Sequence, residues 1–199
     1  MNDQGEKMRI FAAAMAKVDK QRKQKIASIL ADISSGDGKK ASRAIKSLEQ
    51  YGDASVIKPI FEVLKSDQLR EKNKNELIEL LCSIKDTSVI VEVMDILDDG
   101  AFESVHSVAL SAIWNMKVDF SDYIDDFVLI ATNGSFLEAL DCLTIIENLE
   151  GPFMEENLLE CQLHLKNFME SDAPKDEQKM QILQDIAICI KDIDRDLSA

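Results

Sequence analysis

The sequence has few of the residues that break helices or form tight turns. Among its 199 residues are only 7 glycines and 3 prolines. An all-β chain of this length needs many more turn residues, so their scarcity favours helices. Hydrophobic residues make up 46% of the chain, which excludes an intrinsically disordered protein. No apolar run approaches the length that spans a bilayer, so we expect an all-α protein that does not cross a membrane.

The sequence also lacks paired cysteines. Its four cysteines lie far apart, at Cys82, Cys142, Cys161 and Cys189. None belongs to a C-x-x-C pair, and no nearby histidine completes a metal-binding set. Each lies in an apolar helical context, which is typical of buried free thiols in a reducing compartment. We therefore expect no disulfide, metal or other cofactor.

The start of the sequence resembles a cleavable signal peptide only weakly. The apolar stretch Ile10–Ala16 is seven residues long and contains four alanines. It follows the acidic Asp3 and Glu6, which a signal peptide disfavours. We interpret it as part of a helix that packs on the protein, and we expect a cytoplasmic location.

Positive charge is scarce in most of the chain. The net charge is −14, but residues 1–75 hold 16 Lys/Arg against 10 Asp/Glu, and residues 76–199 hold 7 against 27. The acidic part would repel a phosphate backbone, so nucleic acid is an unlikely partner there. The basic run Lys17, Lys20, Arg22, Lys23 and Lys25, continued by Lys39, Lys40 and Arg43, lacks interleaved aromatic residues. It indicates a solvated helix face, weak nucleic-acid binding, or docking onto the acidic part of another copy.

An internal repeat with an offset of 33 residues is present. The segment GDASVIKPIFEVL at 52–64 returns as KDTSVIVEVMDIL at 85–97. A third copy begins at Asp119 and runs through Phe127 and Ile130, and a weaker fourth keeps Leu159 and Leu163. The preceding segments share the offset, in the columns Ala44, Leu77, Leu110, Leu143 and Leu48, Leu81, Trp114. Several columns with one offset indicate a helical repeat protein.

Each repeat unit is predicted to be two amphipathic helices. Ile57, Ile60, Phe61 and Leu64 follow the i, i+3, i+4, i+7 spacing of one helix face. Asp53 and Asp86 precede such faces and are expected to be N-caps. Pro59 predicts a kink or a helix that starts a few residues after Asp53.

One such helix pair cannot bury its own apolar faces, whereas stacked pairs form a continuous core. We therefore expect a single domain, an α-α solenoid of about four to five helix pairs. Residues 1–37 form an N-terminal helical cap, residues 38–170 the repeats, and residues 171–199 a C-terminal capping helix. In the caps, Ile26, Ile29, Leu30 and Ile33 are expected on one face, as are Leu183, Ile186, Ala187 and Ile190.

The run Gly52-Asp53, Val56 to Ile60, Leu64 and Ser66-Asp67 resembles the second helix and following link of HEAT repeats, especially those of the bilin-lyase type. The sequence departs from that pattern after Asp67, where Arg70 comes early and is followed by Asn73 and Asn75. The resemblance covers roughly residues 38–165. It implies a right-handed superhelix whose second helices line a concave binding face, and it carries over no catalytic residue.

Acidic residues recur on the predicted second helices. They are Glu92, Asp95, Asp98, Asp122, Asp125, Asp126, Glu156 and Glu160. Glu92 and Asp125 are 33 residues apart, so they would stack in neighbouring repeats. A ladder of carboxylates on a concave wall favours a Lys/Arg-rich protein or peptide, although a solvated face of an acidic protein gives the same pattern.

Other candidate sites have simpler interpretations. Residues 192–196 alternate acids as an EF-hand does, but the sixth position is Leu197 and the chain lacks the Glu at position twelve. Trp114 falls in a leucine column, which predicts a core position. His106 and His164 have no Cys, Ser or carboxylate at the spacing of a triad or zinc site.

These observations predict a non-enzymatic protein-interaction scaffold with an acidic concave face for a basic partner segment. A HEAT-like nucleic-acid-binding or processing protein is one alternative. A maturation factor for a bound chromophore is another, and it depends on the bilin-lyase-like resemblance alone.

Overall fold

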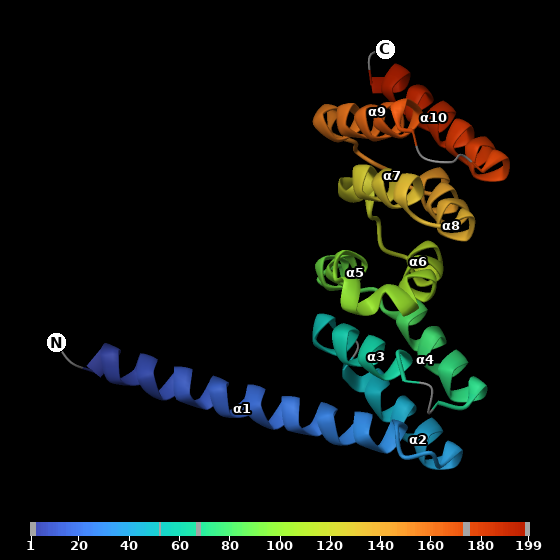
Figure 1. Ribbon diagram of the computed structural model, residues 1–199. Coiled ribbons are helices and arrows are strands. Elements are labelled where there is room, and N and C mark those ends of the chain that lie inside the picture. Colours follow the sequence, from blue (N-terminus) through green and yellow to red (C-terminus); the bar gives the residue numbers. More distant parts are fainter. Residues whose placement is uncertain (1–2, 52, 67–68, 173–175, 198–199) are drawn as a thin grey trace. The chain divides into compact units, whose positions relative to one another are not determined.

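The computed structural model describes residues 3–51, 53–66, 69–172 and 176–197. Within these residues the secondary structure consists of α-helices and short 3-10 turns, without a strand (Figure 1). The prediction of an all-α protein is therefore confirmed. The chain divides into two compact units, Met1–Leu80 and Leu81–Ala199.

The first unit is built on the long helix α1 (Asp3–Ile33), which packs against α2 (Gly38–Leu48) and α3 (Ile57–Leu64). The predicted apolar stripe of α1 is confirmed for Ile26, Ile29 and Ile33, which are buried. Every side chain that the structure describes between Met8 and Gln21 is exposed. The remaining elements are η1 (Glu49–Tyr51), η2 (Ala54–Val56) and most of α4 (Glu71–Ser83).

The junction before α3 follows the sequence closely. The Asp53 carboxylate accepts a hydrogen bond from the Ser55 backbone N–H at 3.0 Å and caps the 3-10 turn η2. The α-helix then begins at Ile57, which places Pro59 in its first turn, where its missing N–H is not required. The prediction of a helix that starts after Asp53 is thus confirmed. The predicted N-cap at Asp86 is wrong: its carboxylate accepts from Ser88 N–H at 2.9 Å in the preceding turn, and Ser88 is the N-cap residue of helix α5 (Val89–Asp98).

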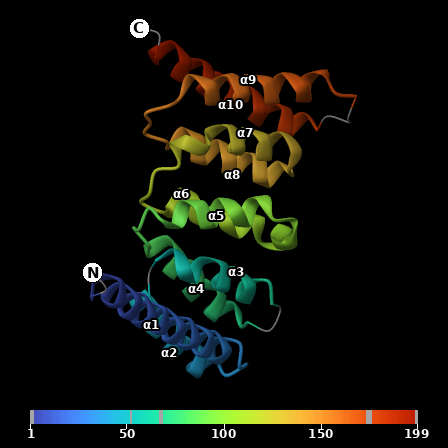
Figure 2. The same ribbon diagram turned by 90° about the vertical axis from the view of Figure 1, so that its left-hand side faces the viewer.

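The second unit places alternate helices in two layers (Figures 1 and 2). Helix α7 packs against both α8 and α9, and α8 packs against α6 and α10. The elements after α4 are α5 (Val89–Asp98), η3 (Gly100–Val105), α6 (His106–Asn115), η4 (Ser121–Tyr123), α7 (Ile124–Asn133), α8 (Phe136–Glu147), α9 (Glu155–Glu170) and α10 (Glu177–Leu197). In α10, Leu183, Ile186 and Ile190 are buried as predicted, whereas Ala187 is exposed.

The 33-residue period does not hold for every buried position. Between α7 and α9 the equivalent buried residues are 34 apart, with Ile124 matching Leu158 and Phe127 matching Cys161. The prediction that Leu159 and Leu163 keep the apolar stripe is therefore wrong, and both side chains are exposed. One extra residue rotates a helix face by about 100°, which moves the predicted leucines to the outside.

The predicted core position of Trp114 is also wrong. Its side chain is 44% exposed, whereas its neighbour Ile113 is 3% exposed. Helix α6 turns Ala109, Leu110 and Ile113 toward the core, so Trp114 lies one position past the buried face.

Candidate functional site

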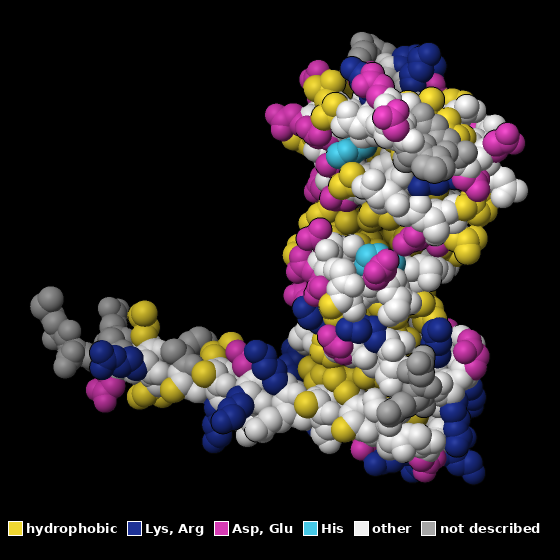
Figure 3. All heavy atoms as spheres, viewed as in Figure 1, with side chains coloured by type: hydrophobic (Ala, Val, Ile, Leu, Met, Phe, Trp, Pro, Cys, Tyr) yellow, Lys and Arg dark blue, Asp and Glu magenta, His cyan; other side chains and the backbone are white. Residues whose placement is uncertain are grey.

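The predicted acidic residues lie on one layer of the second unit, made by α5, α7 with the preceding turn η4, and α9. We call the following set the acidic surface: Glu92, Asp95, Asp98, Asp122, Asp125, Asp126, Glu156 and Glu160. Figure 3 shows Asp and Glu side chains gathered along the side that these helices form. Five members are exposed, and Glu92, Asp125 and Asp126 are half-buried.

Three of these carboxylates act on one another across two helices. Burial raises the pKa of Asp126, and the neighbouring charges of Asp125 and Asp98 raise it further, while His164 acts in the opposite direction. Asp98 ends α5, Asp125 and Asp126 begin α7, and His164 lies on α9. The fold therefore brings together acids that lie far apart in the sequence, and it concentrates negative potential around Asp126. A cation placed there would reduce the repulsion between these carboxylates.

Exposed apolar side chains lie among the acids. Val91 is one turn before Asp95 on α5, and Leu129 is one turn after Asp125 on α7. Leu159 and Leu163 alternate with Glu156 and Glu160 on α9 in the same way, since residues three and four apart share a helix face. All four apolar side chains are exposed. Carboxylates and exposed apolar side chains therefore share this surface.

Asp119 has a structural role in a loop. Its carboxylate accepts hydrogen bonds from the Ser121 hydroxyl at 2.7 Å and from the Glu150 backbone N–H at 3.3 Å. The Ser121 oxygen accepts a further bond from Gly151 N–H at 2.8 Å. This acid therefore links the loops that precede α7 and α9.

The cysteines and one histidine are held inside the second unit. Burial raises the pKa of Cys161 to about 12, and it also raises that of Cys142, so both thiols are protonated and weakly nucleophilic at neutral pH. Both are buried as predicted, whereas Cys82 and Cys189 are half-buried. His106 Nδ1 lies 3.9 Å from Glu138 Oε1, a contact between residues 32 apart that the sequence did not indicate.

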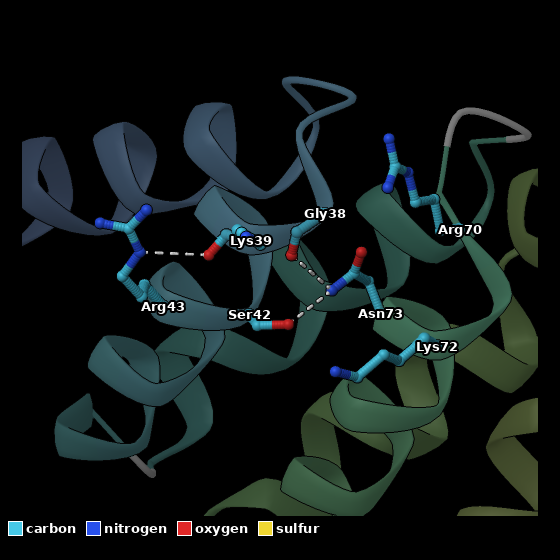
Figure 4. Close-up of a pocket in the computed structure, with 7 residues that line it drawn as sticks. All are labelled: Gly38, Lys39, Ser42, Arg43, Arg70, Lys72 and Asn73. Atoms are coloured by element: carbon cyan, nitrogen blue, oxygen red, sulfur yellow. Dashed lines mark hydrogen bonds between the residues drawn. The ribbon is translucent and has the colours of Figure 1, made fainter.

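The predicted basic run does not form one surface. Arg22 pairs with Asp53, and Lys40 pairs with Asp32 at 2.9 Å, so both serve the packing of α1. Other cations surround a pocket of about 430 Å³ between the starts of α2 and α4 (Figure 4). Its lining residues are Gly38, Lys39, Ser42, Arg43, Arg70, Lys72 and Asn73. Of its cations, Arg70 and Lys72 lie outside the run that the sequence singled out, because their proximity to α2 depends on how the helices pack.

Comparison with known proteins gives one informative match. Over 71 residues the chain is 31% identical to the pole-localizer protein TmaR of Vibrio atlanticus (strain LGP32), a match that covers 35% of this chain and 68% of that protein. No protein-family model matches the chain, and no solved structure does. Among the described residues, no helix is both long and apolar enough to cross a membrane.

Proposed function

Because this chain belongs, over the 71 matched residues, to the family of the pole-localizer protein TmaR, we propose that it is a non-enzymatic binding protein that localises a partner. The name of that relative states a role in positioning, which a binding surface can perform without chemistry. We further propose that the chain works in the cytoplasm. Its helix pairs, as HEAT-like repeats, would form a right-handed superhelix that presents the acidic surface.

The partner in this proposal is a protein segment that is rich in Lys and Arg and carries a few apolar residues. The observation that supports it most directly is the meeting of Asp98, Asp125 and Asp126 on the α5/α7/α9 layer. Basic side chains would neutralise these acids, and the exposed Leu129 and Leu163 would contact the apolar residues of the segment. Complementary charge would mainly speed association and select the partner.

A charge-reversal variant tests this proposal. We expect a labelled Lys/Arg-rich peptide with interspersed leucines to bind the full chain at 50 mM NaCl, measured by fluorescence anisotropy. Binding should weaken by about tenfold at 200 mM NaCl, because salt screens contacts between exposed charges. The variant Asp98→Lys, Asp125→Lys, Glu160→Lys should lose at least tenfold in affinity.

The matched control reverses three exposed acids elsewhere, at Glu49, Glu79 and Glu177. It changes the net charge by the same amount and should retain most of the binding. An equal loss of affinity in both variants would show that net charge alone attracts the peptide. Peptide binding with the same affinity at both salt concentrations would contradict an acidic docking surface.

A further inference from the structure

The pocket between α2 and α4 in the first unit has a rigid polar floor. Asn73 is 2% exposed, and its side-chain amide donates to the Gly38 carbonyl at 3.3 Å and to the Ser42 hydroxyl oxygen at 3.1 Å. The Ser42 hydroxyl in turn donates to Glu76 at 2.7 Å. These bonds join the first turns of two helices, so the pocket is preorganised and does not need a ligand to assemble it.

Four cationic side chains surround this floor. Lys39 and Arg43 come from α2, and Arg70 and Lys72 come from the start of α4 (Figure 4). Within the part of the chain that the structure describes, neither Lys39 nor Arg70 enters an ion pair. Arg43 donates through Nε to the Lys39 carbonyl at 3.3 Å, which leaves its terminal nitrogens for another acceptor.

The acid Glu76 also belongs to this floor. Glu76 accepts from Ser42 and Asn73 and lies 3.6 Å from Lys72. The Ser42 hydroxyl bond is the main reason that the pKa of Glu76 is lowered, with burial opposing it and Asn73 and Lys72 assisting. Its carboxylate is therefore ionised and offsets one positive charge. Four cations lie against Glu76 and the neighbouring Asp37, so the pocket keeps an excess of positive charge.

Glycine at position 38 makes room for one of the cations. A Cβ there would lie 3.0 Å from Arg70 Nη1 and 3.1 Å from Arg70 Cδ, so the arginine lies directly over the backbone at the start of α2. The N–H groups of Lys39 and Lys40 are bonded to the Asp37 carboxylate. An anion in this pocket would therefore be held by side chains and not by the helix terminus.

We propose that this pocket binds a small organic ligand that carries two or more phosphate groups. The guanidinium groups of Arg43 and Arg70 lie toward opposite ends of the pocket (Figure 4), and each can hold a phosphate through two parallel N–H bonds. A volume of about 430 Å³ is of the size that small-molecule ligands occupy. A long polyanion fits less well, since the whole chain has a net charge of −14.

Calorimetric titration of the full chain with ADP and with tripolyphosphate tests this proposal. We expect binding of both at 50 mM NaCl and weaker binding of inorganic phosphate. Arg43→Gln and Arg70→Gln should each reduce affinity at least tenfold, because each removes a guanidinium that would hold a phosphate. Both side chains are exposed, so these substitutions should leave the floor intact. The side-chain amide resonance of Asn73 should shift on titration in the wild type.

Lys23→Gln and Lys46→Gln are the matched controls, as exposed cations outside this pocket, and should change the affinity less than twofold. The proposal is overturned by absence of binding at millimolar concentration, by equal loss in the controls, or by tighter binding of single-stranded RNA or of a glutamate-rich peptide. The acidic surface plays no part in this site, so the two proposals fail independently.

Discussion

Asp126 lies in surroundings that oppose its own charge. It is half-buried at the start of α7, and burial together with Asp125 and Asp98 raises its pKa above the ordinary value of 3.8. A helix N-terminus normally favours a carboxylate, so burial and the neighbouring charges together outweigh that benefit. The ionised Asp126 therefore lowers the stability of the chain.

Replacing this charge should stabilise the protein. A carboxyl whose pKa is raised on folding favours the folded state below its ordinary pKa, and this contribution is lost as the pH rises through the raised value. Asp126→Asn should therefore increase Tm at pH 7 by on the order of 2 °C, and the gain should disappear near pH 3. Thermal unfolding followed by circular dichroism measures this, with the exposed Asp95→Asn as the control. A lower Tm at pH 7 would contradict a carboxylate that is disfavoured in the folded state.

The cysteines should differ in reactivity in the native state. Cys142 and Cys161 are buried with raised pKa values, so almost no thiolate is present at pH 8. We expect neither to react with a thiol reagent until the protein is denatured, when all four cysteines react. Peptide mapping by mass spectrometry identifies the modified residues, and rapid native labelling of Cys161 would show that α9 opens locally.

At the scale of elements, a single lysine joins α10 to the end of α7. Lys179 Nζ donates to the carbonyls of Thr132 at 2.8 Å and Gly134 at 2.6 Å, and it lies 5.2 Å from the centre of the Phe168 ring. The last carbonyls of α7 thus gain a cationic cap from a helix 45 residues away. Burial lowers the pKa of Lys179, while Glu138 and Asp176 oppose that shift.

Removing this cap should destabilise the second unit. Lys179→Met keeps most of the aliphatic stem but leaves the two carbonyls without their donor, which should cost about 1–2 kcal/mol of unfolding free energy. Urea denaturation measures the change. Lys191→Met, an exposed substitution on the same helix, should have little effect. Equal stability of the two variants would mean that water replaces the ammonium group fully.

The sequence predicted helices well where local spacing decides them, and it failed where a loop changes the register. The stripe Ile26, Ile29, Ile33 and the N-cap Asp53 depend on neighbours within a few residues, and both are confirmed. Leu159 was misplaced because one residue of loop length rotates a whole helix face. Trp114 was misplaced for another reason, since Leu110 on the same helix keeps the 33-residue column and is buried. The acids of the acidic surface were visible in sequence, whereas their mutual approach at Asp126 was not. The pocket around Asn73 was missed for the same reason, since it joins residues more than 30 apart.

At the scale of the whole molecule, charge differs sharply between the two compact units. Residues 1–80 hold 16 Lys/Arg against 12 Asp/Glu, and residues 81–199 hold 7 against 25. The second unit must therefore fold against the repulsion of its own carboxylates, and this repulsion depends on the ionic strength.

Salt should consequently raise the stability of the full chain. Between 10 and 150 mM NaCl the Debye length falls from about 30 to about 8 Å, which screens most repulsion between exposed carboxylates. We expect a higher Tm at the upper concentration by scanning calorimetry, and a smaller rise for the variant Asp95→Asn, Asp98→Asn, Asp125→Asn. A Tm that falls with salt would indicate that attractive ion pairs outweigh the repulsion.

Helix α1 is longer than the surface that holds it. Among the side chains that the structure describes on this helix, the first buried one is Ile26, yet the helix starts at Asp3, and those described between Met8 and Gln21 are exposed. The packing of its described side chains is thus concentrated in its last turns. Met8 lies about five helical turns before Ile26, so a fluorophore or affinity tag attached at Met8 would lie far from the buried residues of α1. The protein could therefore be immobilised through this part of the helix without changing its core.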